Sequence, residues 1–450
     1  MRRIHIRRLS FPNGWTLAGI AVWCAFSSYV LAESLGGPPL VWADSKSYAH
    51  VASAPLSSAA LWTGQRPPLV PLFVKVFGAS HGFVAMQATV AAVSWCFLAG
   101  TLGRQVPAGW RRLTANSLVL ALASSLPLVM WDRSVLSESL SLSLLALLFA
   151  MSILLARRVT WPRVAVAAIV SLAFAATRDA QVSTILVLAF VVSVFGIYTI
   201  RNHRSIAPKA GVLAAALFGS FGITQAGQLV SHRADVNVAD VLYVRVFPYP
   251  QRVAWFVHHG MPEGTQIDEL AAGVPVPPET AKVVAPPRDP EFAPLDRWID
   301  RRGSTTYLEW LFTHPGYDLF EPLRRPERAY NFASGDLTFY APVSDPIAAP
   351  LSSIMWPPAT LVLLLAGVTL LASTWTGAHR LVQWRVVLLL VTVSTLAMLV
   401  SWHGDGQETT RHTVEGVAGV RMGVWILFAL ALLSPTRRTR DVPSRTPDAP

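Results

Sequence analysis

Long uncharged stretches recur along this chain, and they limit its fold more than any other feature. Residues Ala180–Ile200 and Ala210–Val230 contain no charged side chain, and each is about as long as a helix that crosses a bilayer core. Apolar residues make up 52% of the chain and charged residues 14%, against roughly 25% charged residues in a soluble domain. The sequence therefore predicts an all-α polytopic membrane protein and argues against a soluble enzyme.

Apolar runs predict about ten transmembrane helices. They cover residues 15–32, 82–103, 113–130, 139–156, 164–177, 180–200, 210–230, 354–376, 386–402 and 417–434. The fifth run is short and the tenth contains Arg421, so both need independent support.

That support comes from the distribution of charge. The termini and short connections that an even count places on one side carry 19 of the 37 basic residues but only two acids, Asp441 and Asp448. The positive-inside rule then puts both termini in the cytoplasm and the acidic connections outside the plasma (inner) membrane. The net charge of +11 is spread over these connections, so it does not indicate a nucleic-acid surface.

The chain divides into an N-terminal membrane part (1–230), an extracytoplasmic part (231–353), C-terminal transmembrane helices (354–434) and a cytoplasmic tail (435–450). The extracytoplasmic part lies between the seventh and eighth spans and has 11 basic and 16 acidic residues. Its proline-rich middle predicts irregular structure. Residues 236–246 have a β-rich or mixed pattern, whereas 304–312 predict a short helix that ends before His314-Pro315. We expect a mixed or irregular domain.

The N-terminal part has a first span that also resembles a signal peptide, and it contains both cysteines of the chain. Arginines before the first span and Val30-Leu31-Ala32 after it also fit a cleaved signal peptide, although the apolar run is longer than a usual signal core. The two cysteines, Cys24 and Cys96, lie inside apolar runs, so no disulfide framework or cysteine metal site is expected.

The connection between the first two spans, residues 33–81, contains the most informative motif. Asp44 is followed four positions later by Tyr48, residues 64–73 read GQRPPLVPLF, and residues 75–78 read KVFG. This arrangement resembles the GT-C membrane glycosyltransferases, and within them the bacterial relatives of protein mannosyltransferases and aminoarabinose transferases. The segment WDRSVLSES at residues 131–139 is a second point of similarity. One departure is that Ser45, rather than a second acid, follows Asp44.

The resemblance implies an inverting sugar transfer from a polyprenyl-phosphate donor, with Asp44 as the base. Such a reaction needs a base at the attacking hydroxyl and positive charge near the departing phosphate. Arg66 suits the phosphate, and Tyr48 is a candidate contact for the donor. The alternatives are that Asp44 caps an interfacial helix and that Arg66 is an arginine that snorkels to the interface.

Further candidates come from other connections. In the resembling enzymes an acid equivalent in place to Asp132 or Glu138 helps to bind a divalent metal or the donor phosphate, so these two residues are candidate metal ligands. Glu138 is the more telling, because an acid near the membrane is costly unless paired. Arg178 could join a phosphate site, but a surface pair with Asp179 is the simpler interpretation.

The last connection, residues 402–415, offers Arg411 as another contact for the donor phosphate. His403, Asp405, Glu408 and His412 also fit a metal site, although their spacing is not a defined one. The competing interpretation is a helix start in which Glu408 pairs with Arg411 and His412.

The sequence thus leads to a hypothesis and two rivals. The hypothesis is an integral membrane glycosyltransferase that moves a sugar from a polyprenyl-phosphate donor to an extracytoplasmic cell-envelope glycan, lipid or protein. It expects no nucleotide cofactor, because no glycine-rich phosphate loop follows a strand. The rivals are a transporter or flippase, which needs ionisable groups at mid-membrane depth, and a non-catalytic envelope assembly protein.

Overall fold

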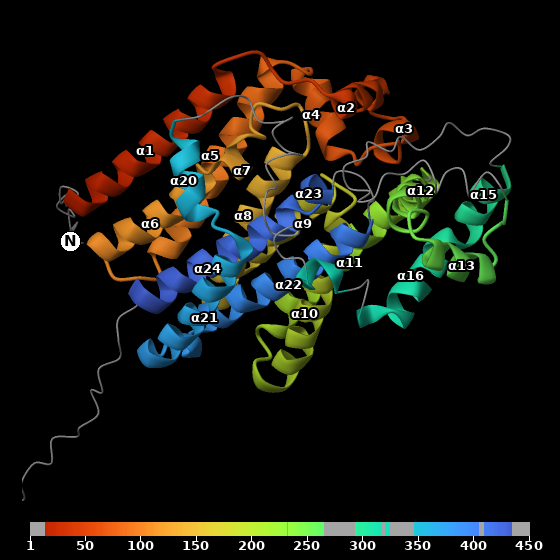
Figure 1. The fold of residues 1–450 in the computed structure, drawn as a ribbon. Helices are drawn as coiled ribbons and strands as arrows, with labels where there is room; N and C mark the ends of the chain where they lie inside the picture. Colours follow the sequence, from red (N-terminus) through yellow and green to blue (C-terminus); the bar gives the residue numbers. More distant parts are fainter. Residues whose placement is uncertain are drawn as a thin grey trace, which may run out of the picture.

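The computed structural model describes residues 14–231, 233–264, 293–316, 320–324, 346–404 and 409–433. Within these ranges the chain is helical, and its β-structure is limited to one isolated parallel bridge between Leu40 and Ser134. Figure 1 shows a bundle of long helices with a smaller helical part beside one end of it. The predicted all-α class is therefore confirmed for the described residues.

Eight of the described helices are long and apolar enough to cross a membrane. They are α1 (Gly14–Leu35), α5 (His81–Gly103), α8 (Glu138–Arg157), α10 (Gln181–Asn202), α11 (Ala207–Val230), α21 (Ala359–Thr376), α22 (Val382–Gly404) and α24 (Val414–Leu433). A multi-pass membrane protein is thus confirmed.

The other two predicted spans are helical but shorter. The span at 164–177 is α9 (Trp161–Ala175), whose 15 residues cover roughly 22 Å, less than the ~30 Å hydrocarbon core. The span at 113–130 is divided into α6 (Trp110–Ala123) and the single turn α7 (Leu126–Val129). The division follows from Pro127, which cannot continue the hydrogen-bonding of α6 and instead lies in the first turn of α7. The count of ten stays a prediction.

The helices α8 and α24 are the most enclosed of the eight. A face of small residues lets α24 approach α22 closely. A Cβ atom on Gly416 would lie 2.7 Å from the Cβ of Met398, and one on Gly419 would lie within 3 Å of Ser394. Small residues of this kind are the usual means of close helix contact in lipid, where van der Waals packing holds helices together.

The connection between α1 and α5 is also helical. It contains α2 (Ala43–Ser53), α3 (Ala59–Trp62) and α4 (Leu69–Phe77). Ser45 lies in the first turn of α2, where its hydroxyl accepts a hydrogen bond from the Trp42 N–H at 2.9 Å. The same hydroxyl donates to the Val135 carbonyl at 2.7 Å. With the Leu40–Ser134 bridge, these bonds fix the first connection against the loop before α8.

The part after α11 contains α12 (Arg233–Arg245), α13 (Pro250–His258), α15 (Ala293–Trp298), a π-helical turn (Ile299–Gly303), α16 (Ser304–Thr313) and α17 (Glu321–Arg324). Another short helix, α20 (Ala348–Met355), precedes α21. The helices α12 to α16 share a hydrophobic cluster of their own, in which Phe247, Phe256 and Trp310 are buried.

One prediction for this part is confirmed and one is wrong. The helix expected at 304–312 is α16. The β-rich or mixed pattern expected at 236–246 is wrong, because those residues lie mainly in α12. Val238, Val241 and Leu242 all join the cluster, and their spacing of three and four places them on one helical face. Burial of that face outweighs the β-preference of the valines.

Candidate functional site

Six charged side chains from separate segments meet at one end of the bundle, and we call them the charge network. They are Asp44 in the first turn of α2, Arg66 between α3 and α4, Glu138 at the start of α8, Arg178 between α9 and α10, Arg411 in α23 (Thr409–His412), and Glu415 in the first turn of α24. Five of them come from the candidates predicted from the sequence. Figure 1 shows α2, α3 and α23 near this end.

Asp44 is held by two arginines. Its Oδ1 lies 2.5 Å from Nη2 of Arg66, and its Oδ2 lies 2.8 Å from Nη2 of Arg411. Arg66 also donates from Nε to the Ser47 hydroxyl at 2.7 Å. Asp44 is not the N-cap of α2, which is Trp42. The helix-cap alternative for Asp44 is therefore wrong, whereas the snorkelling alternative for Arg66 is not tested by these contacts.

The arginines decide the ionisation of Asp44. Partial burial alone would raise the pKa of this carboxyl group, but the positive charges of Arg411 and Arg66 outweigh burial and hold the pKa below its ordinary value. Asp44 is thus a carboxylate whose negative charge is stabilised by the two arginines.

Glu138 lies deeper than Asp44 and shares Arg411 with it. Its side chain has no exposed surface, and its Oε1 accepts from Arg411 Nε at 2.5 Å and lies 3.4 Å from Arg178 Nη1. A buried carboxylate is tolerated only when paired in this way. Arg411 therefore connects the buried Glu138 to the partly exposed Asp44.

The simpler interpretation of Arg178, a surface pair with Asp179, is wrong. Arg178 is 6% exposed, and its Nη1 lies 2.7 Å from Oε1 of Glu415. Its Nη2 lies 3.0 Å from Nδ1 of His412. Asp179 instead pairs with Arg233 at the start of α12, at 2.9 Å. Side chains of adjacent residues in a tight turn point in different directions, so adjacency in the sequence does not predict that the two residues form an ion pair.

Glu415 is the member of the charge network that the sequence reasoning did not assign, and His412, considered there as a metal ligand or a partner of Glu408, contacts Arg178 instead. An acid in the first turn of a long apolar span is the signal that would have found Glu415, since such an acid needs a partner. His412 accepts from Arg178. Its pKa is held well below the ordinary value by burial and then by the positive charges of Arg178 and Arg411.

Tyr48 lies under Arg66. It is 3% exposed, its hydroxyl donates to Ser137 Oγ at 3.2 Å, and the Arg66 guanidinium lies 5.3 Å from the centre of its ring. Burial raises the pKa of its hydroxyl group. Tyr48 therefore supports Arg66 and joins α2 to the residue before Glu138.

Asp132 does not join the charge network. It is 6% exposed and accepts from Ser139 Oγ, while Gln87 donates to the carbonyls of Asp132 and Ser134 at 2.7 Å each. Burial raises the pKa of Asp132 to about 7. Asp132 and Glu138 thus have separate partners, and the loop between them is held by backbone contacts.

The expectation of a metal ion stays a prediction. Within the described ranges no three His, Cys, Asp or Glu side chains form a group that could hold one. Glu138 is engaged by two arginines, and His403 is 3.3 Å from the hydroxyl of Tyr307. Asp405 and Glu408 lie outside the described residues.

Exposure along the charge network defines where a ligand can reach it. The Arg66 and Asp44 side chains are 31% and 24% exposed, whereas those of Arg178, Arg411, Glu138 and Glu415 are 7% exposed or less. The open end therefore presents one carboxylate between guanidinium groups, with more charge buried behind it. The guanidinium groups at this end suit an anion, and the carboxylate between them suits a hydroxyl group beside that anion.

Comparison with models of protein families, with characterised proteins and with solved structures found no match to this chain.

Proposed function

We propose that this chain is an integral membrane glycosyltransferase of the GT-C type, with Asp44 as its general base. The single observation that carries the proposal is the placement of Asp44, an accessible carboxylate between Arg66 and Arg411 at one end of the apolar bundle. Transfer of a sugar from a lipid phosphate to a hydroxyl group requires a base near groups that bind the phosphate, and this site has both.

The donor would be a sugar on a polyprenyl phosphate. Its lipid part would stay in the bilayer beside the bundle, while its phosphate would meet Arg66 and Arg411 at the bilayer surface. Guanidinium groups bind phosphate oxygens through paired, charge-assisted hydrogen bonds. Arg66 is the more exposed of the two and would make the first contact.

Binding of the phosphate would also activate the base. The two arginines lower the pKa of Asp44. Once the arginines pair with the phosphate, they stabilise the Asp44 carboxylate less. The pKa of Asp44 then rises, and the carboxylate becomes a better proton acceptor. The enzyme would thus hold its base inactive until the donor is present.

The transfer itself would be a direct displacement. The acceptor hydroxyl would form a bond from oxygen to the anomeric carbon as the bond from that carbon to the phosphate oxygen breaks. The electron pair would leave with polyprenyl phosphate, stabilised by Arg66 and Arg411, and the hydroxyl proton would pass to Asp44. Attack opposite the leaving group inverts the anomeric centre.

The proposed location follows from the distribution of charge. Basic termini and connections support cytoplasmic termini, and the acidic connections that carry Asp44, Glu138 and Arg411 then lie outside the plasma membrane. The acceptor would be an extracytoplasmic glycan, lipid or protein of the cell envelope. In this orientation the helices α12 to α16 would lie on the same side and could contact it.

Release of free polyprenyl phosphate from a panel of polyprenyl-phosphate sugars tests the proposal. The full-length protein would be purified and supplied with an envelope extract as acceptor source, beside D44N and the matched control D179N. Asp179 is an aspartate at the same end of the bundle, but it pairs with Arg233. We expect release by the wild type and D179N and at least a hundredfold slower release by D44N. Equal release by D44N would contradict the role of Asp44, and no release by any protein would contradict the activity.

The transporter alternative has one observation to consider, a buried charge inside a candidate span. Arg421 in α24 is 1% exposed, donates to the Pro357 carbonyl at 2.6 Å, and lies over the Trp356 ring. These contacts engage it in fixing the turn between α20 and α21. We therefore favour chemistry at the charge network over translocation through the bundle.

A further inference from the structure

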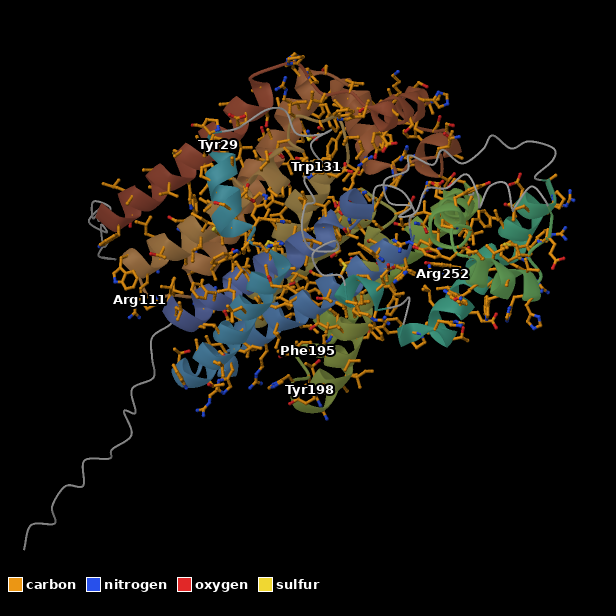
Figure 2. The ribbon with its side chains drawn as sticks, in the orientation of Figure 1. Tyr29, Arg111, Trp131, Phe195, Tyr198 and Arg252 are labelled. Atoms are coloured by element: carbon orange, nitrogen blue, oxygen red, sulfur yellow. The ribbon has the colours of Figure 1, made fainter. Side chains whose placement is uncertain are left out.

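A groove at the end of the bundle opposite the charge network has the features of a phospholipid site. It lies where α1 begins, α5 ends and α6 begins, with a volume of about 290 Å³. Trp15, Ile20 and Leu113 give it apolar walls, and Arg104 and Arg112 border it. In Figure 2 the neighbouring Arg111 lies at this end of the bundle, away from Trp131 in the upper centre.

The groove lies beside the less buried half of α1. The buried residues of α1 are Phe26, Val30 and Ser34, all in its second half. In the first half Trp15 is 50% exposed and Ile20 is 51% exposed. In a membrane, these exposed apolar side chains and the groove beside them would meet lipid.

Polar groups in the groove lack partners. The Nε1 of Trp23 and the Oδ1 of Asn116 are buried without a hydrogen-bond partner in the described part of the chain. Asn116 is 6% exposed and presses against Gly103, where even a Cβ atom would lie within 3 Å of its oxygen. An unbonded buried polar group is costly, so a ligand with both hydrogen-bond acceptors and donors would stabilise this site.

The two arginines at the groove have N–H donors available to bind an anion. Arg112 donates from Nε to the Gly103 carbonyl at 3.0 Å, which holds its side chain over the groove. Neither Arg112 nor Arg104 makes a salt bridge within the described residues. Both guanidinium groups can therefore bind phosphate oxygens at the membrane surface.

We propose that this groove binds one anionic glycerophospholipid whose head group carries hydroxyls, with its phosphate between Arg104 and Arg112. The glycerol and head-group oxygens would face Trp23 and Asn116, and one acyl chain would lie along the first half of α1. Apolar walls open to the side favour a lipid over a soluble anion, because a free phosphate would leave those walls uncovered. The site is independent of the proposed transfer reaction.

Native mass spectrometry of the full-length protein would test this proposal. The protein would be mixed with phosphatidylglycerol or with phosphatidylcholine of the same acyl chains, and retained lipid would be counted. R104Q/R112Q removes the phosphate contacts. The matched control is R157Q/R158Q, which removes two exposed arginines at the end of α8. We expect retained phosphatidylglycerol to fall at least tenfold in R104Q/R112Q and to stay unchanged in the control.

A second variant tests the groove without changing charge. Gly19 borders the groove, and a Cβ atom there would meet nothing within 4 Å, so G19L would place an apolar side chain in the groove. G367L is its control, because Gly367 in α21 is equally open but lies outside the groove. We expect G19L to lose the lipid and G367L to keep it.

Four results would overturn the proposal. They are equal retention of phosphatidylcholine, equal loss in both arginine pairs, full retention by G19L, and displacement of the lipid by an equal concentration of glycerol phosphate. The last result would identify a soluble-anion site.

Discussion

Arg411 donates from Nε to Oε1 of Glu138 at 2.5 Å, although 273 positions separate the two residues in the chain. The bond ties the short helix before α24 to the first residue of α8. Because the Glu138 side chain has no exposed surface, water cannot replace Arg411 as its partner. The start of α8 is thus held to the segment that leads into α24 through a charged pair.

Replacing Glu138 should destabilise the protein. In E138Q, Arg411 and Arg178 would lose the carboxylate they share, and we expect a loss on the order of 3 kcal/mol in the free energy of unfolding. Chemical denaturation in detergent would measure it. E309Q is the control, because the Glu309 side chain is 56% exposed and its change should cost little. Equal stability of E138Q and E309Q would contradict the structural role of Glu138.

Arg178 should not tolerate lysine. Its two terminal nitrogens reach Glu415 and His412 in different directions, and a single ammonium group cannot span both. We expect R178K to lose about 1–3 kcal/mol in the free energy of unfolding, since a buried charged hydrogen bond is broken. R157K, at an exposed position, should behave as wild type in the same measurement. Unchanged stability of R178K would show that one contact suffices.

Asp132 should make the protein less stable as the pH rises. Burial raises its pKa from 3.8 to about 7, so the folded state favours the protonated form. The stabilisation is complete below pH 4 and is lost as the pH rises towards 7, at up to about 1.4 kcal/mol per pH unit. D132N keeps an acceptor for Ser139 and should flatten this dependence. Thermal unfolding of both proteins from pH 4 to 8 would measure the difference, and parallel curves would contradict the burial of a neutral acid.

His412 should have the opposite effect. Its pKa is lowered well below 6.5, so the folded state favours the neutral ring. That stability is present above pH 6.5 and is lost as the pH falls. The test belongs in the D132N background, where the opposing contribution of Asp132 is absent. H412Q can accept from Arg178 without a proton, so D132N/H412Q should lose less stability between pH 7 and pH 5 than D132N. Equal losses would contradict a neutral His412.

Most of the helical framework could be predicted from the sequence, because hydrophobic length is a local property. Residues Ala180–Ile200 and Ala210–Val230 are apolar for long enough that only a helix satisfies their backbone in lipid. Local composition does not decide the structure where packing opposes it. In α12 the β-branched composition gave a β-rich or mixed pattern, and the cluster into which Val238, Val241 and Leu242 pack favours the helix.

The sequence by itself determined that this is a membrane protein of long helices and that Asp44, Arg66, Glu138 and Arg411 lie beside their ends, because apolar runs and the charges that interrupt them are written along the chain. Only the tertiary structure decided which charges meet. It placed Arg178 on Glu415 rather than beside Asp179, and it kept Asp132 apart from Glu138. The physical reason is that a buried charge must find its partner in space, and that partner is chosen by how the helices pack.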